Sequence, residues 1–129
     1  MYIKQIIDPE THGYGSITEA DIVVTDGEYE LMCYYYDING EVKEGMPVKE
    51  VSTLFAVDIM RLDEKKYLVQ KNHGKGEHYS YYLHGKVLDK TVPLIGIGEL
   101  VIELDAPLPK DIEQGEFVEF KVGRLDCYI

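Results

Sequence analysis

The fold of this chain is decided by residues 20–36, whose sequence is ADIVVTDGEYELMCYYY. Two runs of strand-forming residues flank Asp26-Gly27, and an Asp-Gly pair in this position is a strong signal for a β-hairpin. Glycine is favoured there because it adopts the positive φ that tight hairpin turns require. We therefore expect two antiparallel strands, at residues 20–25 and 28–36.

The second of these strands alternates between two kinds of side chain, as is typical of a strand with one face in the core. One face carries Tyr29, Leu31, Cys33 and Tyr35, and the other carries Glu28, Glu30, Met32, Tyr34 and Tyr36. The strand is expected to end at another turn, at residues 37–40, where the chain reads Asn39-Gly40.

Similar turn signals recur along the chain, because a glycine is followed at once by a glutamate at residues 27, 40, 76, 98 and 115. Most of these pairs come just before an alternating apolar run. The runs predict further strands at residues 53–62, 67–71, 78–88, 100–104 and 116–122. Within the last of them, Val118, Phe120 and Val122 are expected to face the core.

Residues 46–62 are open to two interpretations. Apolar residues recur there at helical spacing, at Val48, Val51, Phe55, Ile59 and Leu62. The segment 53–61 also alternates like a strand and is rich in β-favouring residues. We prefer a strand over 53–62, with a short helix as the alternative.

The chain of 129 residues fits one domain, residues 1–129, and 45% of it is hydrophobic. About six or seven strands, frequent turns and little helix predict an all-β fold. We expect a small antiparallel barrel of the OB-like or Greek-key type, because closing a sheet removes its exposed edges.

The segment 108–120, LPKDIEQGEFVEF, resembles the passages of OB-fold domains in which a proline, a loop and a glycine lead into a strand. It covers about a tenth of the chain. The resemblance implies a five-stranded barrel with a face that could hold a ligand. It assigns a functional role to no individual residue of this chain.

The chain is acidic, with 24 Asp and Glu residues against 13 Lys and Arg, for a net charge of −11. Phosphate backbones are bound mainly through Lys and Arg, so generic nucleic acid is not an expected partner. No apolar run reaches the roughly 18 residues of a membrane-spanning helix, and Lys4 and Asp8 interrupt any signal-peptide core. We expect a cytoplasmic protein that does not insert into a membrane and whose Cys33 and Cys127 stay reduced.

The sequence contains no recognisable motif for catalysis, metal binding or a cofactor. His78 and His84 share a strand face but are about 20 Å apart, too far to bind one metal ion. None of the serines occurs in a nucleophile-elbow sequence such as G-x-S-x-G. We therefore expect no catalytic residue, no metal and no cofactor, and we prefer a binding role to an enzymatic one.

The candidate binding surface comes from the tyrosines, of which the chain has 11, against three phenylalanines and no tryptophan. A tyrosine ring with its polar hydroxyl suits protein interfaces. Alternation places Tyr34 and Tyr36 on the outer face of one strand, and Tyr82 and His84 on the outer face of another. If these strands are neighbours, the four residues form one exposed surface.

These observations favour a small binding or interaction module whose partner is a protein or a second copy of itself. Recognition of an oligonucleotide or a saccharide through exposed tyrosines is the first alternative. A small hydrolase whose site residues come from distant strands is the second.

Overall fold

The computed structural model describes residues 1–11, 16–37 and 40–129. These residues contain eleven β-strands and no helix, so the expected all-β fold is confirmed and the expected count of six or seven strands is too low. The strands are β1 (Tyr2–Thr11), β2 (Ile17–Thr25), β3 (Glu30–Tyr36), β4 (Glu50–Leu54), β5 (Val57–Leu62), β6 (Leu68–Lys71), β7 (Tyr81–Asp89), β8 (Leu94–Ile97), β9 (Leu100–Glu103), β10 (Phe117–Val122) and β11 (Arg124–Tyr128).

The hairpin expected within residues 20–36 is confirmed by β2 and β3. The strands pair antiparallel, with Val24 opposite Leu31 and Ile22 opposite Cys33, and all four side chains are fully buried. Pairing ends where Thr25 faces Glu30, so residues 26–29 form the turn. The later turn expected at residues 37–40 falls partly on residues 38 and 39, which lie outside the described part of the chain.

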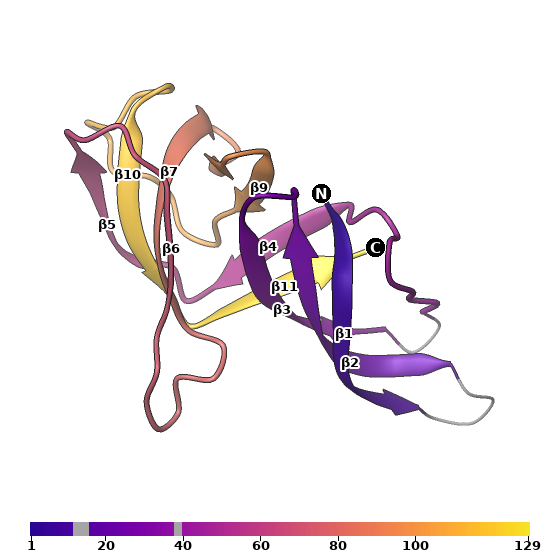
Figure 1. Cartoon of the computed structure of the whole chain (residues 1–129). Coiled ribbons are helices and arrows are strands. Elements are labelled where there is room, and N and C mark those ends of the chain that lie inside the picture. The colour runs from indigo at the N-terminus through magenta and orange to yellow at the C-terminus, as the bar shows by residue number, and fades with distance from the viewer. Residues whose placement is uncertain (12–15, 38–39) are drawn as a thin grey trace.

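All eleven strands belong to one mixed sheet (Figure 1). Its main path runs in the order β1–β2–β3–β11–β4–β9–β8–β7–β10–β5, and β6 pairs with β7 beside this path. The pairings of β3 with β11 and of β4 with β9 are parallel. The path has two ends, β1 and β5, so the sheet is not closed, and neither the barrel nor its OB-like or Greek-key type is confirmed.

Strands β4 and β5 pair with β11 and β10 to form one bent antiparallel ribbon that runs through both halves of the sheet. β4 and β5 are consecutive in the chain, as are β10 and β11, and β5 pairs with β10 while β4 pairs with β11. Both arms bend at the same level, at residues 55–56 and at Gly123, whose N–H donates to the carbonyl of Leu54 at 3.0 Å. The strand expected over 53–62 is therefore confirmed, with a bend inside it, and the helical alternative is wrong.

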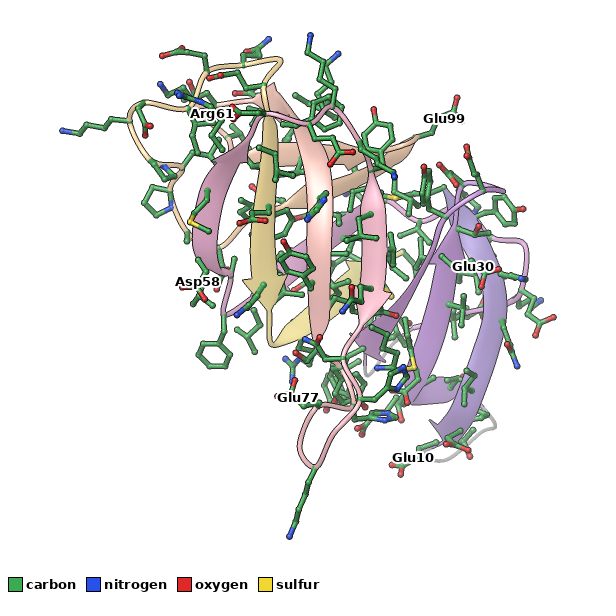
Figure 2. The ribbon with its side chains drawn as sticks, turned by 60° about the vertical axis from the view of Figure 1, so that its left-hand side comes forward. Glu10, Glu30, Asp58, Arg61, Glu77 and Glu99 are labelled. Atoms are coloured by element: carbon green, nitrogen blue, oxygen red, sulfur yellow. The ribbon has the colours of Figure 1, made fainter. Side chains whose placement is uncertain are left out.

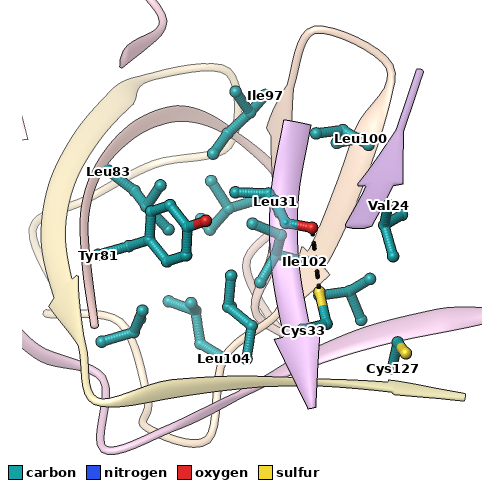
Figure 3. Packing of buried hydrophobic residues seen from close by; sticks show 14 of the residues in the cluster. Val24, Leu31, Cys33, Tyr81, Leu83, Ile97, Leu100, Ile102, Leu104 and Cys127 are labelled. Carbon is teal, nitrogen blue, oxygen red and sulfur yellow. Dashed lines mark hydrogen bonds between the residues drawn. The ribbon is translucent and has the colours of Figure 1, made fainter. Parts of the chain in front are cut away.

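The core contains side chains from both halves of the sheet path, including β3 and β7. Figure 3 shows Leu31 and Cys33 of β3 packed near Tyr81 and Leu83 of β7. A hydrogen bond also connects the two strands, because the N–H of Met32 donates to the hydroxyl oxygen of Tyr81 at 2.9 Å. Burying a large apolar side chain contributes about 1.5–3 kcal/mol, so a core of this kind holds the two halves of the sheet together. That the chain unfolds as a single domain stays a prediction.

The last expected strand also has its core face as predicted, because Val118, Phe120 and Val122 are all buried. Cys33 and Cys127 are free, buried thiols. Burial raises the pKa of Cys33 well above its ordinary value, and the neighbouring Cys127 raises it further. A thiol kept protonated in the core is unreactive.

Candidate functional site

Four strands, β6, β7, β10 and β5, present one face to the core and the other to solvent, and Figure 2 looks onto the solvent side. Their register aligns two rows of side chains across that side. The first row is Gln70, Tyr82, Lys121 and Val57, and the second is Leu68, His84, Glu119 and Met60. Residues that alternate with these rows, such as Tyr81 and Phe120, are buried.

Two adjoining open pockets hollow this face. The sheet pocket, of about 650 Å³, is lined by Asp58, Met60, Tyr82 and Glu119 together with three shared residues. The bend pocket, of about 760 Å³, lies at the bend of the ribbon, and the residues that line it alone are Phe55, Val57, Lys71, His73, Glu77, Ser80, Val122 and Gly123. Gln70, Asn72 and Lys121 line both pockets. The two pockets therefore form one continuous depression, which we call the outer groove.

Tyr82, His84 and Glu119 form a hydrogen-bonded cluster at the sheet pocket. The Tyr82 hydroxyl donates to the Glu119 carboxylate, and Nε2 of His84 lies 2.9 Å from the Tyr82 oxygen and 3.7 Å from Glu119. Because the Tyr82 proton is directed at Glu119, His84 must donate through its Nε2–H. The hydrogen bond to Glu119 and burial raise the pKa of Tyr82, so its phenol stays protonated. The cluster fixes the Tyr82 ring at the edge of the groove.

Phe55 stands at the bend of the ribbon, 68% exposed and with a positive φ of 61°. A positive φ is strained for a bulky residue, because Cβ comes too close to the following carbonyl. Asp105 holds this conformation, since its two carboxylate oxygens accept the N–H groups of Phe55 at 2.8 Å and Ala56 at 3.0 Å. The Thr53 hydroxyl also donates to Asp105, at 2.6 Å. We call this arrangement the Asp105 clamp.

The Asp105 clamp is intact at neutral pH. Burial acts to raise the pKa of Asp105, but the hydrogen bonds from Thr53, Ala56 and Phe55 outweigh it and lower the pKa below its ordinary value. Gly123, on the facing arm, leaves room for the Phe55 ring, because an added Cβ there would lie 3.3 Å from Cδ2 of Phe55. The backbone and its neighbours thus present the Phe55 ring to solvent.

Lys71, the last residue of β6, lines the bend pocket. Its ammonium donates to the carbonyl of His78 and lies 5.2 Å from the centroid of the Tyr81 ring. Burial lowers the pKa of Lys71 and outweighs the Asp21 carboxylate, which acts to raise it. Beside it, the Asn72 amide donates to the Ser80 hydroxyl at 3.0 Å, and Ser80 donates to a backbone carbonyl at 3.1 Å. These bonds give the pocket a fixed polar wall.

Tyr34 belongs to a different cluster. Its hydroxyl donates to Glu19 at 3.0 Å, its ring packs edge-on against Tyr79 with centroids 6.0 Å apart, and the Arg124 guanidinium lies 4.6 Å from its centroid. β3 pairs with β2 and β11, whereas β7 pairs with β6, β8 and β10, so the two strands are not neighbours in the sheet. Tyr36 is 60% exposed at the end of β3. That the four predicted surface residues serve one partner stays a prediction.

The outer groove offers apolar surface, charges and hydrogen-bonding groups, but no activated nucleophile among its described residues. Tyr82 is held protonated, and the Ser80 hydroxyl donates to the Val122 carbonyl and not to a base. Across residues 1–11, 16–37 and 40–129, no group of three or more His, Cys, Asp or Glu side chains is placed to hold a metal ion. Within the same ranges, no helix has the length and hydrophobicity needed to cross a membrane. Its apolar and polar side chains make the outer groove the candidate site for a ligand.

Three groove residues, Phe55, Lys71 and Glu119, were not singled out by the sequence, and neither was Asp105, which holds the bend. Phe55 had a usable signal, because the four apolar residues at 54–57 interrupt the alternation and mark the bend. Glu119 could have been found by parity, since it alternates with the buried Val118 and Phe120. Asp105 had none, because it bonds to Phe55, 50 residues earlier in the chain. Lys71 had none, because its bond to His78 depends on how the intervening loop folds back.

Comparison of the chain with protein-family models, curated proteins and solved structures finds no match. Function must therefore be inferred from the chemistry of the groove itself.

Proposed function

We propose that this protein is a small binding module, without catalytic activity, that holds an extended segment of a partner protein in the outer groove. The observation that carries the proposal is the continuity of the groove, which joins Tyr82 to the exposed Phe55 through residues common to both pockets. Four strands about 4.8 Å apart give it a span of about 14 Å, enough for about four residues of an extended chain.

The exposed apolar side chains along the groove favour a protein partner. Phe55, Val57 and Met60 are 68%, 50% and 54% exposed, and all three line its walls. Exposed apolar side chains gathered on one face mark interaction sites, and Tyr82 adds a ring of the kind enriched in protein interfaces. Gln70, on the other side of Tyr82, supplies a side-chain amide that can pair with a peptide backbone.

We expect the partner on this face and not along the free edge of β5. Among the described strands β5 pairs only with β10, but Asp58 interrupts it with a positive φ of 55°. Its register with β10 also shifts between Glu119 and Lys121. Bulges and charged side chains of this kind protect a strand edge from pairing with another chain.

A neutral saccharide is the second candidate ligand, favoured by the amides of Gln70 and Asn72 beside the Tyr82 ring. Planar amides and an aromatic face can hydrogen-bond to and stack on a sugar. An oligonucleotide has less support, because the net charge is −11 and Asp58 and Glu119 line the same pocket. A hydrolase has the least, since the groove has no activated nucleophile among its described residues.

The finer parts of the fold and location belong to the same proposal. We propose that the path β4–β9–β8–β7–β10–β5 is an incomplete barrel of the OB-like or Greek-key type. Its support is that β4 and β5, the two ends of this path, are consecutive in the chain. A cytoplasmic location is compatible with the two free, buried cysteines.

A random-peptide phage library selected on the immobilised protein tests the function. We expect enriched peptides whose binding falls about tenfold in Tyr82→Ala, because this change removes the ring that borders the groove. Tyr2→Ala, which removes an exposed tyrosine from β1 at the far end of the sheet path, is the matched control and should leave binding unchanged. Tyr36→Ala reports whether the surface extends beyond the groove.

Two results would reject the protein-partner proposal: no peptide is enriched, or enriched peptides bind Tyr82→Ala as well as the wild type. A parallel glycan array gives the second candidate its own outcome, which is binding of a neutral oligosaccharide that Tyr82→Ala abolishes. Fluorescence anisotropy with single-stranded and duplex oligonucleotides should show no binding at physiological salt. Micromolar binding with a steep salt dependence would instead favour the nucleic-acid alternative.

A further inference from the structure

Lys71 differs from the other cations that the structure holds in place. Carboxylates lie within ion-pair distance of the following described cations: Lys4, Arg61, Lys90, Lys121 and Arg124. Lys71 is held by the His78 carbonyl and the Tyr81 ring, and no carboxylate of the described residues forms an ion pair with it. The Asp21 carboxylate acts on Lys71 from beyond ion-pair distance and is itself bonded to His78 and Tyr79. The half-buried ammonium therefore has no carboxylate in contact with it, and this favours an incoming anionic group.

Phe55 forms the apolar wall of the same pocket, in a backbone conformation that a glycine would adopt without strain. Strained residues of this kind persist where the surrounding structure holds them, and they cluster at ligand sites. The surrounding structure here is the Asp105 clamp. Because the ring is exposed, its contribution to the core does not explain why a phenylalanine occupies this position. Contact with a ligand would explain an exposed phenylalanine at this position.

We infer that the bend pocket binds a defined part of the partner segment: an apolar side chain that packs on Phe55, next to a carboxylate side chain that pairs with Lys71. This inference rests on the proposed function and specifies the chemistry of the segment that the groove accepts. Asp105 acts here as a positioning residue, because it contacts the backbone that presents Phe55 and does not itself line the bend pocket.

The charges that line the bend pocket agree with this assignment. They comprise the ammonium groups of Lys71 and Lys121 against the single carboxylate of Glu77, in a molecule with a net charge of −11. Lys121 already forms an ion pair with Asp58, whose carboxylate lies 3.6 Å from its ammonium, so Lys71 is the main anchor for the anion. Figure 2 shows that Asp58 and Glu77 both lie toward the end of the face away from Arg61. Glu77 would repel a second acidic residue, which limits the segment to one carboxylate at this point.

The peptides enriched from the phage library provide the probes. We expect them to carry an apolar residue next to Asp or Glu. One such peptide, labelled with a fluorophore, is synthesised in two forms, one with the acid and one with the corresponding amide, Asn or Gln. In anisotropy titrations with the wild-type protein the amide form should bind about tenfold more weakly, the effect of losing one charge-assisted hydrogen bond.

Protein variants assign that preference to its residues. Lys71→Gln should bind the acid and amide forms equally. Lys75→Gln, at a lysine of the loop that follows β6 and outside the pocket lining, removes the same net charge and should keep the preference. Phe55→Gly should weaken both forms without lowering the thermal unfolding midpoint, which a merely structural role for the ring would not produce. If Lys71→Gln does not fold, binding of the acid and amide peptides to the wild-type protein still tests whether the pocket prefers a carboxylate.

Equal binding of the acid and amide peptides to the wild type overturns this inference. So does a loss of preference in Lys75→Gln as large as that in Lys71→Gln, because the effect would then reflect net charge alone. In either case a continued dependence on Tyr82 leaves the proposed function intact. Failure to enrich any peptide rejects the proposed function itself.

Discussion

Two bends of this chain are fixed by the same device, an aspartate carboxylate that accepts backbone N–H groups. At the β2–β3 hairpin, Asp26 accepts the N–H groups of Glu28 at 2.9 Å and Tyr29 at 2.8 Å. It also accepts the N–H of Glu99 at 2.8 Å, which ties the hairpin to the β8–β9 turn. The positive φ, 101°, falls on Gly27, and a glycine adopts it without strain.

At the β4–β5 bend, the Asp105 clamp holds two N–H groups and a hydroxyl in the same way, but the positive φ falls on Phe55. The comparison teaches that an aspartate-clamped bend has no need of a strained residue. Asp58, the other strained residue in this region, also lines the groove. Two of the three described non-glycine residues with positive φ, Phe55 and Asp58, therefore lie beside the outer groove. The third, Asp8, lies in β1, and the β2–β3 hairpin has none.

The largest expected effect tests whether the two bends belong to one cooperatively unfolding unit, so that their free energies of unfolding can be compared. Phe120→Ala should destabilise the protein by about 3–5 kcal/mol, because Phe120 is fully buried in the shared core. Urea denaturation should give one transition at one midpoint by tyrosine fluorescence and by far-ultraviolet circular dichroism. Two separate transitions, or a loss below about 1 kcal/mol, would mean that the bends belong to different cooperative units.

The hairpin and the core faces were predictable because they follow from local rules. Asp26-Gly27 marks a turn wherever it occurs between strands, and alternation identified Leu31 and Phe120 as core residues. The strand count was not predictable, because bends divide what reads as one run. Gly123 separates β10 from β11, and a single apolar stretch gives no sign that its two parts pair with different strands.

The second-largest expected effect comes from removing the aspartate that holds each bend, Asp26 or Asp105. Burial acts to raise the pKa values of Asp26 and Asp105, but hydrogen bonds outweigh it and lower both. A lowered folded-state pKa stabilises the protein above the unfolded value, about 3.9, and this stability is lost as the pH falls through the folded value. Asp26→Ala and Asp105→Ala should each lose about 1–3 kcal/mol at pH 7, and less at acid pH.

Urea denaturation at neutral pH and below pH 4 measures both parts of this prediction. Asp63→Ala, at an exposed turn residue outside both clamps, is the control and should change stability by less than about 0.5 kcal/mol. A clamp variant that keeps the full acid dependence of the wild type would show that its carboxylate does not hold the bend.

The binding groove was only partly predictable, for a physical reason. Parity placed Tyr82 and His84 on the outer face, and register then brought them to Glu119 on β10. Tyr34, assigned to the same surface by the same rule, lies in another cluster because the strand order separates β3 from β7. Alternation reports which face a side chain occupies, but strand order is set by contacts between distant residues.

The smallest expected effect measures the backbone strain at the residue with positive φ, which is where the two bends differ. At position 55, glycine should be more stable than alanine by about 1 kcal/mol, because Phe55→Ala keeps the positive φ and Phe55→Gly relieves its strain. Gly27→Ala should be destabilising by a similar amount. At Val57, an exposed strand residue without a positive φ, the order should reverse, with alanine about 0.5–1 kcal/mol more stable than glycine.

Thermal unfolding of the paired variants measures these differences, and their signs matter more than their sizes. If alanine is as stable as glycine at position 55, the bend holds no strain, and the two aspartate-clamped bends differ only in sequence. If glycine is more stable than both alanine and the wild-type phenylalanine, the natural residue keeps the chain below the stability it could reach at this position. A residue that reduces stability while exposing its ring points to a role outside the fold, and the adjoining pocket, where no carboxylate contacts the Lys71 ammonium, is where we propose that role.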